Sequence, residues 1–298
     1  MRKDKRAASH MLSSIAEAIL EATQVLRKAG VSEGRREAGS LLAQVIVRDR
    51  TFLITHAGDF LEPDDLRIFR EHVARRAKGE PLQYITGHQD FYGLDFEVNP
   101  AVLIPRPETE ILVDTALELI GNREAESSLC DVGTGSGCIA ITLLHERPRA
   151  LAIAVDISAA ALDVAARNAA RHCVSERITF KVSDCFAALD KTAVRFDLIV
   201  SNPPYISDKD LAGLQREVRD FEPRSALTAA ADGLAVIQRL LTDAPDFLIN
   251  GGHLVMEIGF GQRAAVEEVI DARIWRLVSI RDDLQGIPRT VTLQKRDP

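Results

Sequence analysis

Residues 129–141 read Leu-Cys-Asp-Val-Gly-Thr-Gly-Ser-Gly-Cys-Ile-Ala-Ile, which is a short apolar strand, a glycine-rich turn and the start of an apolar helix. Gly133, Gly135 and Gly137 let the backbone turn sharply and approach a ligand where a Cβ atom would collide. The G-x-G-x-G spacing differs from the dinucleotide G-x-G-x-x-G, and no Lys-Ser/Thr pair follows as in a P-loop. The stretch therefore predicts one strand–helix unit of an α/β sheet, with either a nucleotide site or a plain tight turn.

Acidic residues flank this turn and end the next two expected strands. Asp131 precedes the glycines, where it would repel a pyrophosphate but suit the ammonium of an amino-acid group. Asp156 ends an apolar stretch, a position typical of a ribose ligand in doubly wound folds and also of a helix N-cap. Asp184 follows a third strand and can accept a hydrogen bond from an adenine amino group. A ligand with an amino-acid end, a ribose, an adenine and no phosphate is S-adenosylmethionine.

Residues 196–201 form a run of strand-forming residues that ends in Asn202, Pro203, Pro204 and Tyr205. The two prolines lack N–H donors, so the backbone cannot continue a ladder and its carbonyls need other partners. Asn202 adds a side-chain acceptor, and Tyr205 adds a flat aromatic face. This tetrapeptide is suited to holding a planar NH2 group, although a rigid strand-ending turn is the simpler interpretation. None of the four is a strong base or nucleophile, so a reactive co-substrate has to supply the chemistry.

With these motifs the chain resembles the class I S-adenosylmethionine-dependent methyltransferases with an (Asp/Asn/Ser)-Pro-Pro-(Tyr/Phe/Trp) motif. Within them it resembles the release factor glutamine N5-methyltransferases. The closer resemblance is carried by residues 79–87 (GEPLQYITG), 91–94 (FYGL), 102–110 (VLIPRPETE) and 217–224 (EVRDFEPR), and by 257–259 (EIG) with Gln262 and 283–286 (DLQG) with Arg289. It covers roughly residues 12 to 294.

The resemblance implies a Rossmann-like sheet of seven strands with the last antiparallel, and a small N-terminal helical bundle joined to it by a β-hairpin. The expected divisions are a substrate-recognition domain at residues 1–85, a hairpin linker at 86–105 and a methyltransferase domain at 106–298. Within the first domain, residues 1–10 are polar, basic and without periodicity, which predicts disorder, and Ser32 is expected to cap the second helix.

The resemblance also implies the reaction, which is methyl transfer to the glutamine side-chain nitrogen in the Gly-Gly-Gln loop of class I peptide chain release factors. S-adenosylmethionine is the donor and S-adenosylhomocysteine the product. Asn202, Pro203, Pro204 and Tyr205 are then the catalytic residues. The cofactor-binding residues are expected to be Asp131, Gly133, Thr134, Gly135, Ser136, Gly137, Asp156, Asp184, Cys185 and Asn202. Cys185 stands where the family usually has an aromatic residue against the adenine, so the neighbouring Phe186 or another apolar residue is a candidate to replace it.

The composition is that of an ordinary globular enzyme with 298 residues, of which 46% are hydrophobic. We find no apolar run long enough to span a membrane and no signal-peptide pattern, which favours a cytoplasmic protein. The four cysteines show no C-x-x-C pairing and are expected to be buried free thiols. The seven histidines lack metal-ligand spacing, so we expect no metal, and we expect a monomer.

Charge is distributed unevenly along the chain. Residues 1–85 carry 15 Lys or Arg and 12 Asp or Glu, a balance of +3, whereas the remainder has a balance of −10. The acidic catalytic part tells against an alternative function as a nucleic-acid methyltransferase acting on adenine N6 or guanine N2. The intact glycine turn tells against a non-catalytic binding protein. A basic cluster (Arg67, Arg70, Arg75, Arg76 and Lys78) is either a solvated helix face or a docking surface for an acidic partner.

Overall fold

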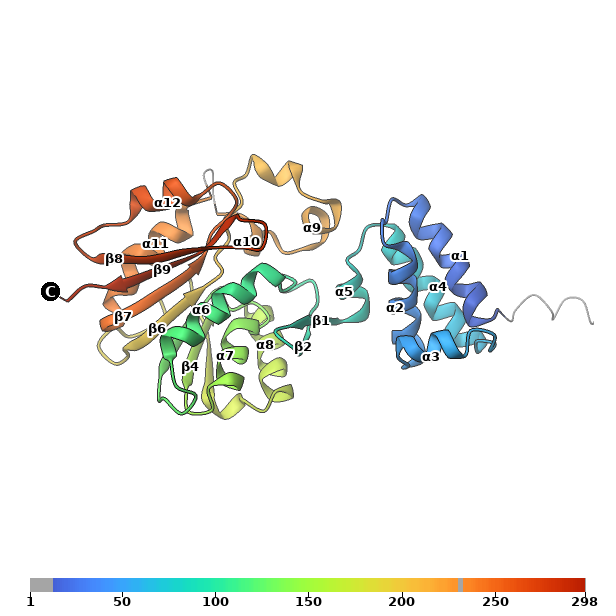
Figure 1. Cartoon of the computed structure of the whole chain (residues 1–298), viewed down its shortest axis with the longest axis horizontal. Helices are drawn as coiled ribbons and strands as arrows, with labels where there is room; N and C mark the ends of the chain where they lie inside the picture. The colour runs from blue at the N-terminus through green and yellow to red at the C-terminus, as the bar shows by residue number, and fades with distance from the viewer. Residues whose placement is uncertain (1–12, 230–232, 298) are drawn as a thin grey trace, which may run out of the picture. The chain divides into compact units, whose positions relative to one another are not determined.

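The computed structural model of the protein describes residues 13–229 and 233–297. The predicted disorder of residues 1–10 lies outside this part of the chain. The chain divides into two compact units (Figure 1). The helical unit comprises the chain up to Gly87 together with Arg216–Phe221, and the catalytic unit comprises His88–Gln215 and the chain from Glu222 onward. In the described ranges, no helix is both long and apolar enough to cross a bilayer.

The helical unit consists of α1 (Ile15–Lys28), α2 (Gly34–Ile46), α3 (Arg50–Thr55), α4 (Pro63–Ala77), α5 (Leu82–Thr86) and α9 (Arg216–Phe221). A capping box between Ser14 and Glu17 starts α1. The expected cap at Ser32 was wrong, because α2 begins at Gly34 with Glu33 at the N-cap and no side-chain cap bond. Ser32 lies in the turn between α1 and α2, one residue too early to reach the first helical amides.

Apolar residues at helical spacing form the core of the helical unit. Leu26, Leu41, Leu42 and Phe69 are each at most 1% exposed. They come from α1, α2 and α4, the helices whose sequences place apolar side chains on one face. Burial of four such side chains stabilises the unit by about 1.5–3 kcal/mol each.

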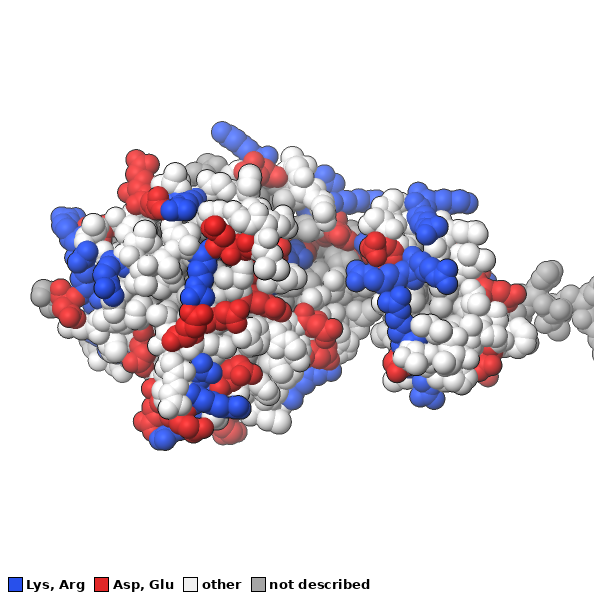
Figure 2. All heavy atoms as spheres, in the orientation of Figure 1, with Lys and Arg blue, Asp and Glu red and all other residues white. Residues whose placement is uncertain are grey.

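The four arginines of the basic cluster are paired within the helical unit. Their salt bridges join Arg67 to Glu71 (2.8 Å), Arg70 to Glu21 (2.9 Å), Arg75 to Glu80 (2.5 Å) and Arg76 to both Glu37 (2.5 Å) and Glu217 (2.9 Å). On the face that Figure 2 shows, both basic and acidic side chains lie over these helices, and the basic ones gather in a band. For Arg67, Arg70 and Arg75 the pairing supports a solvated, internally neutralised helix face more than a basic docking surface, whereas Arg76 is buried.

The catalytic unit is built on a seven-stranded sheet with the order β5-β4-β3-β6-β7-β9-β8. Its strands are β3 (Ser128–Val132), β4 (Leu151–Asp156), β5 (Ile178–Val182), β6 (Phe196–Ser201), β7 (Leu248–Glu257), β8 (Trp275–Asp282) and β9 (Pro288–Lys295). The strands from β3 to β7 pair in parallel, whereas β9 runs antiparallel to both β7 and β8. The expected fold class, with its antiparallel last strand, is therefore confirmed.

Helices cover both faces of this sheet (Figure 1). One face packs against α6 (Glu110–Ile120), α7 (Cys138–Glu146) and α8 (Ala159–Arg171), and the other against α11 (Ala235–Asp243) and α12 (Arg263–Val269). The remaining elements of this unit are short: α10 (Arg224–Leu227), η2 (Pro107–Thr109), η3 (Ser175–Arg177), η4 (Asp210–Gly213) and η5 (Ala244–Asp246). Because both faces are covered, the parallel strands read as nearly continuous apolar runs.

The cysteines are free thiols, as their spacing predicts. Cys130, Cys138 and Cys185 are buried, but Cys173 is exposed. The expectation of burial was wrong for Cys173 because it lies in the turn after α8, with a left-handed φ of 57°.

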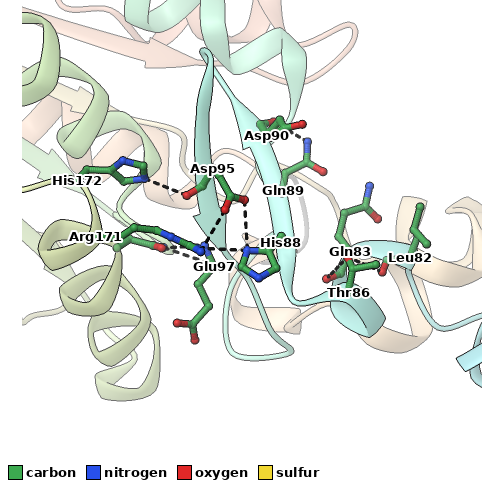
Figure 3. A network of polar contacts seen from close by, with 11 residues as sticks. Leu82, Gln83, Thr86, His88, Gln89, Asp90, Asp95, Glu97, Arg171 and His172 are labelled. Carbon is green, nitrogen blue, oxygen red and sulfur yellow. Dashed lines mark hydrogen bonds and ion pairs between the residues drawn. The ribbon is translucent and has the colours of Figure 1, made fainter. Parts of the chain in front are cut away.

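A β-hairpin of β1 (His88–Phe91) and β2 (Leu94–Glu97) begins the catalytic unit. Its turn residues Tyr92 and Gly93 both have positive φ, 52° and 74°, the pattern of a two-residue hairpin turn. Figure 3 shows how Asp95 of β2 is held. Its carboxylate lies 3.2 Å from His88 Nδ1 and 3.2 Å from Arg171 Nη2, and its carbonyl oxygen lies 2.9 Å from His172 Nε2.

Asn168 of α8 joins this hairpin to the glycine-rich turn. The side chain is fully buried. Its Oδ1 accepts from the Glu97 amide at 2.7 Å, and its Nδ2 donates to the carbonyl oxygens of Glu97 at 3.0 Å and Ser136 at 2.9 Å. One side chain thus fixes the hairpin and the turn that follows β3 in a common frame.

Candidate active site

A cavity of about 330 Å³ lies at the carboxyl ends of β3, β4, β5 and β6. This is the edge of an open α/β sheet where ligands bind. The predicted site residues that line the cavity are Gly133, Thr134, Gly135, Ser136, Asp156, Asp184, Cys185, Asn202, Pro203 and Pro204. Asp131, Gly137 and Tyr205 are outside this lining. Asp131 and Gly137 are hydrogen-bonded to the lining residue Thr134, and Tyr205 follows the lining residue Pro204 in sequence. The sequence therefore anticipated residues that the fold brings together around one cavity.

The glycine-rich turn requires its glycines for two different reasons. Gly133 and Gly135 have φ of 76° and 55°, and a Cβ atom at either would meet nothing within 4 Å. These two positions therefore leave open space on the cavity side. At Gly137, φ is 82° and a Cβ atom would lie 2.6 Å from Cδ1 of Ile141 and 3.2 Å from Cβ of Ala165. Gly137 is thus needed for helix packing, as the third glycine of such a turn often is.

Asp131 is buried beneath this turn, with 1% of its surface exposed. Its Oδ2 accepts from Thr134 Oγ1 at 2.7 Å and from the Ala140 amide at 3.3 Å. Its Oδ1 has no hydrogen-bond partner among the described residues, and neither has Oγ of Ser136. Burial raises the pKa of Asp131 to about 7. A buried carboxylate with a free oxygen favours a nearby positive charge.

Asp156 supports the same turn from the end of β4. Its Oδ2 accepts from the Gly135 amide at 2.9 Å, and its Oδ1 accepts from the Ser158 amide at 2.9 Å. Ser158, whose side chain accepts from Ala161, is the N-cap of α8, so Asp156 is not that cap. Burial raises the pKa of Asp156, while these amide hydrogen bonds oppose the shift. The carboxylate lines the cavity where a ribose ligand is expected.

At the end of β5 the structure separates Cys185 from Phe186. Cys185 lines the cavity with φ of 49°. Phe186 is 4% exposed and stacks on Phe247 with ring centroids 4.8 Å apart. Phe186 is not among the residues that line the cavity and packs in a hydrophobic cluster that also contains Cys185, so the structure gives no support to Phe186 as a replacement for the missing aromatic. Asp184 lines the cavity and forms a 2.7 Å salt bridge with Arg239.

Asn202 and Tyr205 share a buried polar network at the end of β6. Asn202 Nδ2 donates to Thr109 Oγ1 at 3.0 Å, and Thr109 Oγ1 donates to Glu257 Oε2 at 2.7 Å. The hydroxyl of Tyr205 donates to Glu257 Oε1 at 3.2 Å. Burial raises the pKa of Tyr205 above its ordinary value, and the nearby carboxylate of Glu257 adds to the shift. Tyr205 is therefore neutral and cannot serve as a base at ordinary pH.

Several lining residues have no role that the sequence predicts. Val102, Leu103, Pro105, Arg106 and Thr109 line the cavity, and all belong to the stretch 102–110. In the sequence this stretch shows only a resemblance to a family. Its alternation of apolar residues and prolines gives no periodic signal, so only proximity in the fold shows its role.

The helical unit and part of the catalytic unit match two family models. Residues 17–87 match the PrmC N-terminal domain, and residues 108–218 match the methyltransferase small domain. A release factor glutamine methyltransferase of Koribacter versatilis is 44% identical over 95% of this chain and 99% of its own. A protein of the same description from Moorella thermoacetica is 40% identical over 95% of this chain and 99% of its own.

Solved structures of low identity confirm the fold. A methyltransferase of Pyrococcus furiosus has a TM-score of 0.52 at 16% identity, covering 76% of this chain and 99% of its own. The hMettl16 catalytic domain has a TM-score of 0.54 at 16% identity, covering 80% and 84%. Sequence identity of 40–44% over nearly the full length of both chains shows a shared family as well as a shared fold. This chain is a methyltransferase that belongs to the release factor glutamine methyltransferase family.

Proposed function

We propose that the enzyme transfers the methyl group of S-adenosylmethionine to the side-chain amide nitrogen of the glutamine in the Gly-Gly-Gln loop of class I peptide chain release factors. The observation that carries this proposal is the placement of Asn202, Pro203 and Pro204 on the same cavity as the glycine-rich turn. A site that can accept hydrogen bonds from a planar NH2 group thus lies beside a site suited to a nucleoside that carries an amino-acid group.

The residues around the turn fit S-adenosylmethionine. The open space at Gly133 and Gly135 would let the ligand approach the protein backbone closely. The unpartnered oxygens of Asp131 and Ser136 suit the amino-acid end of the ligand. Asp156, Asp184 and Cys185 line the same cavity. Asp156 would accept hydrogen bonds from the ribose, and Asp184 and Cys185 would contact the adenine. S-adenosylmethionine supplies an electrophilic methyl group on a sulfonium, with the homocysteine thioether as leaving group.

Residues 202–205 would hold and activate the amide nitrogen of the substrate. An amide nitrogen is a poor nucleophile because its lone pair is delocalised into the carbonyl. Hydrogen bonds from its NH2 group to Asn202 Oδ1 and the Pro203 carbonyl would hold the nitrogen and return electron density to it. Pro204 and the ring of Tyr205 would wall the amide plane and exclude water. The amide proton leaves to solvent after transfer, so no strong base is needed.

A protein substrate needs contacts beyond one glutamine, and we place these in the helical unit. This unit is not required to build the cavity, since every lining residue belongs to the catalytic unit. We further propose that the enzyme acts as a monomer in the cytoplasm and that it does not bind nucleic acid. Acidic side chains gather over α6 on the face seen in Figure 2, which is unfavourable for a phosphate backbone.

The test is methylation by wild-type enzyme of a release factor, DNA and RNA in parallel, with labelled S-adenosylmethionine. We expect label only in the release factor, and loss of that label when its loop glutamine is replaced. Asn202→Ala should lower kcat by about 100-fold or more, as loss of a preorganised polar group does. Asn122→Ala is the matched control, because Asn122 is exposed in the loop before β3 and outside the cavity lining. Label in nucleic acid alone would contradict the proposal.

A further inference from the structure

Thr109 connects two residues that are far apart in sequence. It ends η2 at the start of α6 and is 2% exposed, while Glu257 ends β7 and is 1% exposed. Thr109 Oγ1 lies 2.7 Å from Glu257 Oε2 and 3.0 Å from Asn202 Nδ2. The other carboxylate oxygen of Glu257 accepts from the Tyr205 hydroxyl at 3.2 Å. Both oxygens of one buried carboxylate are therefore engaged by hydroxyl groups.

The count of hydrogens in this network determines which way Asn202 faces. A threonine hydroxyl carries one hydrogen, and an ionised carboxylate can only accept. The hydrogen of Thr109 must therefore point to Glu257, so the oxygen of Thr109 is left as an acceptor on its other side. Among the described residues, the NH2 group of Asn202 donates to that acceptor, at 3.0 Å. Its Oδ1 is then held on the opposite edge of the planar amide.

We infer that Thr109 and Glu257 are positioning residues that fix the side chain of Asn202 with its oxygen, rather than its NH2 group, toward the substrate. This inference rests on the proposed function, in which Oδ1 accepts a hydrogen bond from the glutamine NH2 group. A flipped Asn202 would set its own donors against the donors of the substrate, and the nucleophilic nitrogen would lose its anchor. Neither Thr109 nor Glu257 needs to touch the reacting atoms.

The charge state of Glu257 controls the network, because a protonated Glu257 could donate to Thr109 and release the constraint. The charged groups facing it are Arg289 of β9, which is paired with Asp283 at 3.0 Å, and Glu108 of η2, together with the ionisable Tyr205. Burial raises the pKa of Glu257, whereas the Thr109 and Tyr205 hydroxyls and Arg289 lower it. The net direction is upward from the ordinary value, so Glu257 is protonated, and the constraint weakened, at a higher pH than for an exposed glutamate.

Three threonine variants test the inference in the full-length enzyme, with kcat measured on a release factor at saturating S-adenosylmethionine. Thr109→Val removes the hydroxyl at nearly constant volume, and Thr109→Ser keeps it. Thr115→Val is the matched control, since Thr115 is also buried in α6 but bonds only to the Ile111 carbonyl, at 2.7 Å. We expect Thr109→Val to lose up to about 100-fold in kcat, Thr109→Ser to recover most of that loss, and Thr115→Val to match wild type. Affinity for S-adenosylmethionine, measured by calorimetry, should stay within about threefold in all three, because Thr109 acts on the acceptor side.

The possible results distinguish a failure of the positioning role from a failure of the proposed function. Wild-type enzyme that leaves the release factor unmethylated overturns the proposed function. Active wild type with equal kcat in Thr109→Val and Thr115→Val, or with equal losses in Thr109→Val and Thr109→Ser, overturns only the positioning role. If Thr109→Val does not fold, Glu257→Gln decides by its pH profile. The kcat of wild type should decrease at low pH, as Glu257 becomes protonated. Glu257→Gln should lack this decrease, so the same decrease of kcat in the variant would overturn the inference.

Discussion

Arg76 Nη2 of α4 forms a 2.9 Å salt bridge with Glu217 Oε2 of α9, although the two residues belong to opposite halves of the sequence. The same guanidinium binds Glu37 of α2 at 2.5 Å and donates to the Glu80 carbonyl at 3.2 Å. The helical unit is thus completed by a segment inserted from far along the chain. Arg76 ties that segment to α2 and α4.

The first prediction concerns this arginine. Arg76→Leu should lower the free energy of unfolding of the helical unit by about 3–5 kcal/mol, because it leaves the buried carboxylate of Glu37 unpaired. Methylation of a release factor should fall with it, while affinity for S-adenosylmethionine should not change. Urea unfolding and calorimetry measure the two effects. Arg67→Leu in the same helix is the control, since its pairs are more than half exposed and worth about 0–1 kcal/mol. Equal destabilisation by both variants would contradict this role for Arg76.

The second prediction concerns Gly135. Gly135→Val should abolish binding of S-adenosylmethionine, because the branched side chain would fill the open space beside the turn. It should also cost about 1–3 kcal/mol of stability from backbone strain at a φ of 55°. Gly30→Val separates the two effects, since Gly30 has a φ of 87° and open surroundings but lies in the helical unit. Wild-type affinity in a folded Gly135→Val would show that the ligand does not approach this glycine.

The third prediction is a pH dependence of cofactor binding through Asp131. A ligand ammonium would favour the ionised carboxylate and lower its pKa from about 7, so binding releases a proton below that pH. Affinity should therefore rise with pH up to about 7, by as much as about tenfold per pH unit. Calorimetry should be kept below about pH 7.5, where the ligand amino group is itself protonated. Asp131→Asn should bind more weakly and lose this dependence, and a pH-independent wild type would contradict the assignment.

The fourth prediction is that the same carboxylate opposes folding. The pKa of Asp131 is raised from 3.8 to about 7 on folding, so the native state holds more protons than the unfolded state between these values. Its contribution to stability is complete below about pH 3.8 and is lost as the pH rises through about 7. Asp131→Asn should therefore gain stability relative to wild type as the pH increases over this window. Thermal unfolding of both proteins at several pH values would show it, and parallel curves would refute it.

The fifth prediction concerns Cys185, which lines the cavity where the family usually has an aromatic residue. Cys185→Phe should preserve or tighten binding of S-adenosylmethionine, since stacking on the adenine is worth on the order of 1 kcal/mol. Phe186→Leu is the comparison, because Phe186 stacks on Phe247 and should affect stability rather than affinity. A large loss of affinity in Cys185→Phe would show that this side chain has no room on the cavity side.

The sheet and the polar ends of its strands could be predicted because their signals are local. Asp156 and Asn202 each end an apolar run, and parallel strands bring such ends to one edge. The pairing of Thr109 with Glu257 could not be predicted, since the two are 148 residues apart and neither lies in a periodic pattern. The insertion of α9 into the helical unit could not be predicted for the same reason, because α9 is far in sequence from the other helices of that unit. A wrong expectation arose where neighbouring residues compete for one role, as with Ser32 and Glu33 at a helix start.

The inserted α9 also has a consequence for the order in which the protein is made. A ribosome releases the helices up to α5 first, but Glu217 emerges only after β3, β4, β5 and β6 have been synthesised. Domains generally fold as units from the N-terminus during synthesis. Here the first unit to leave the ribosome has to wait for a segment from the second half of the chain before Arg76 gains its last ionic partner. Completion of the helical unit therefore depends on prior synthesis of the first four strands of the seven-stranded sheet.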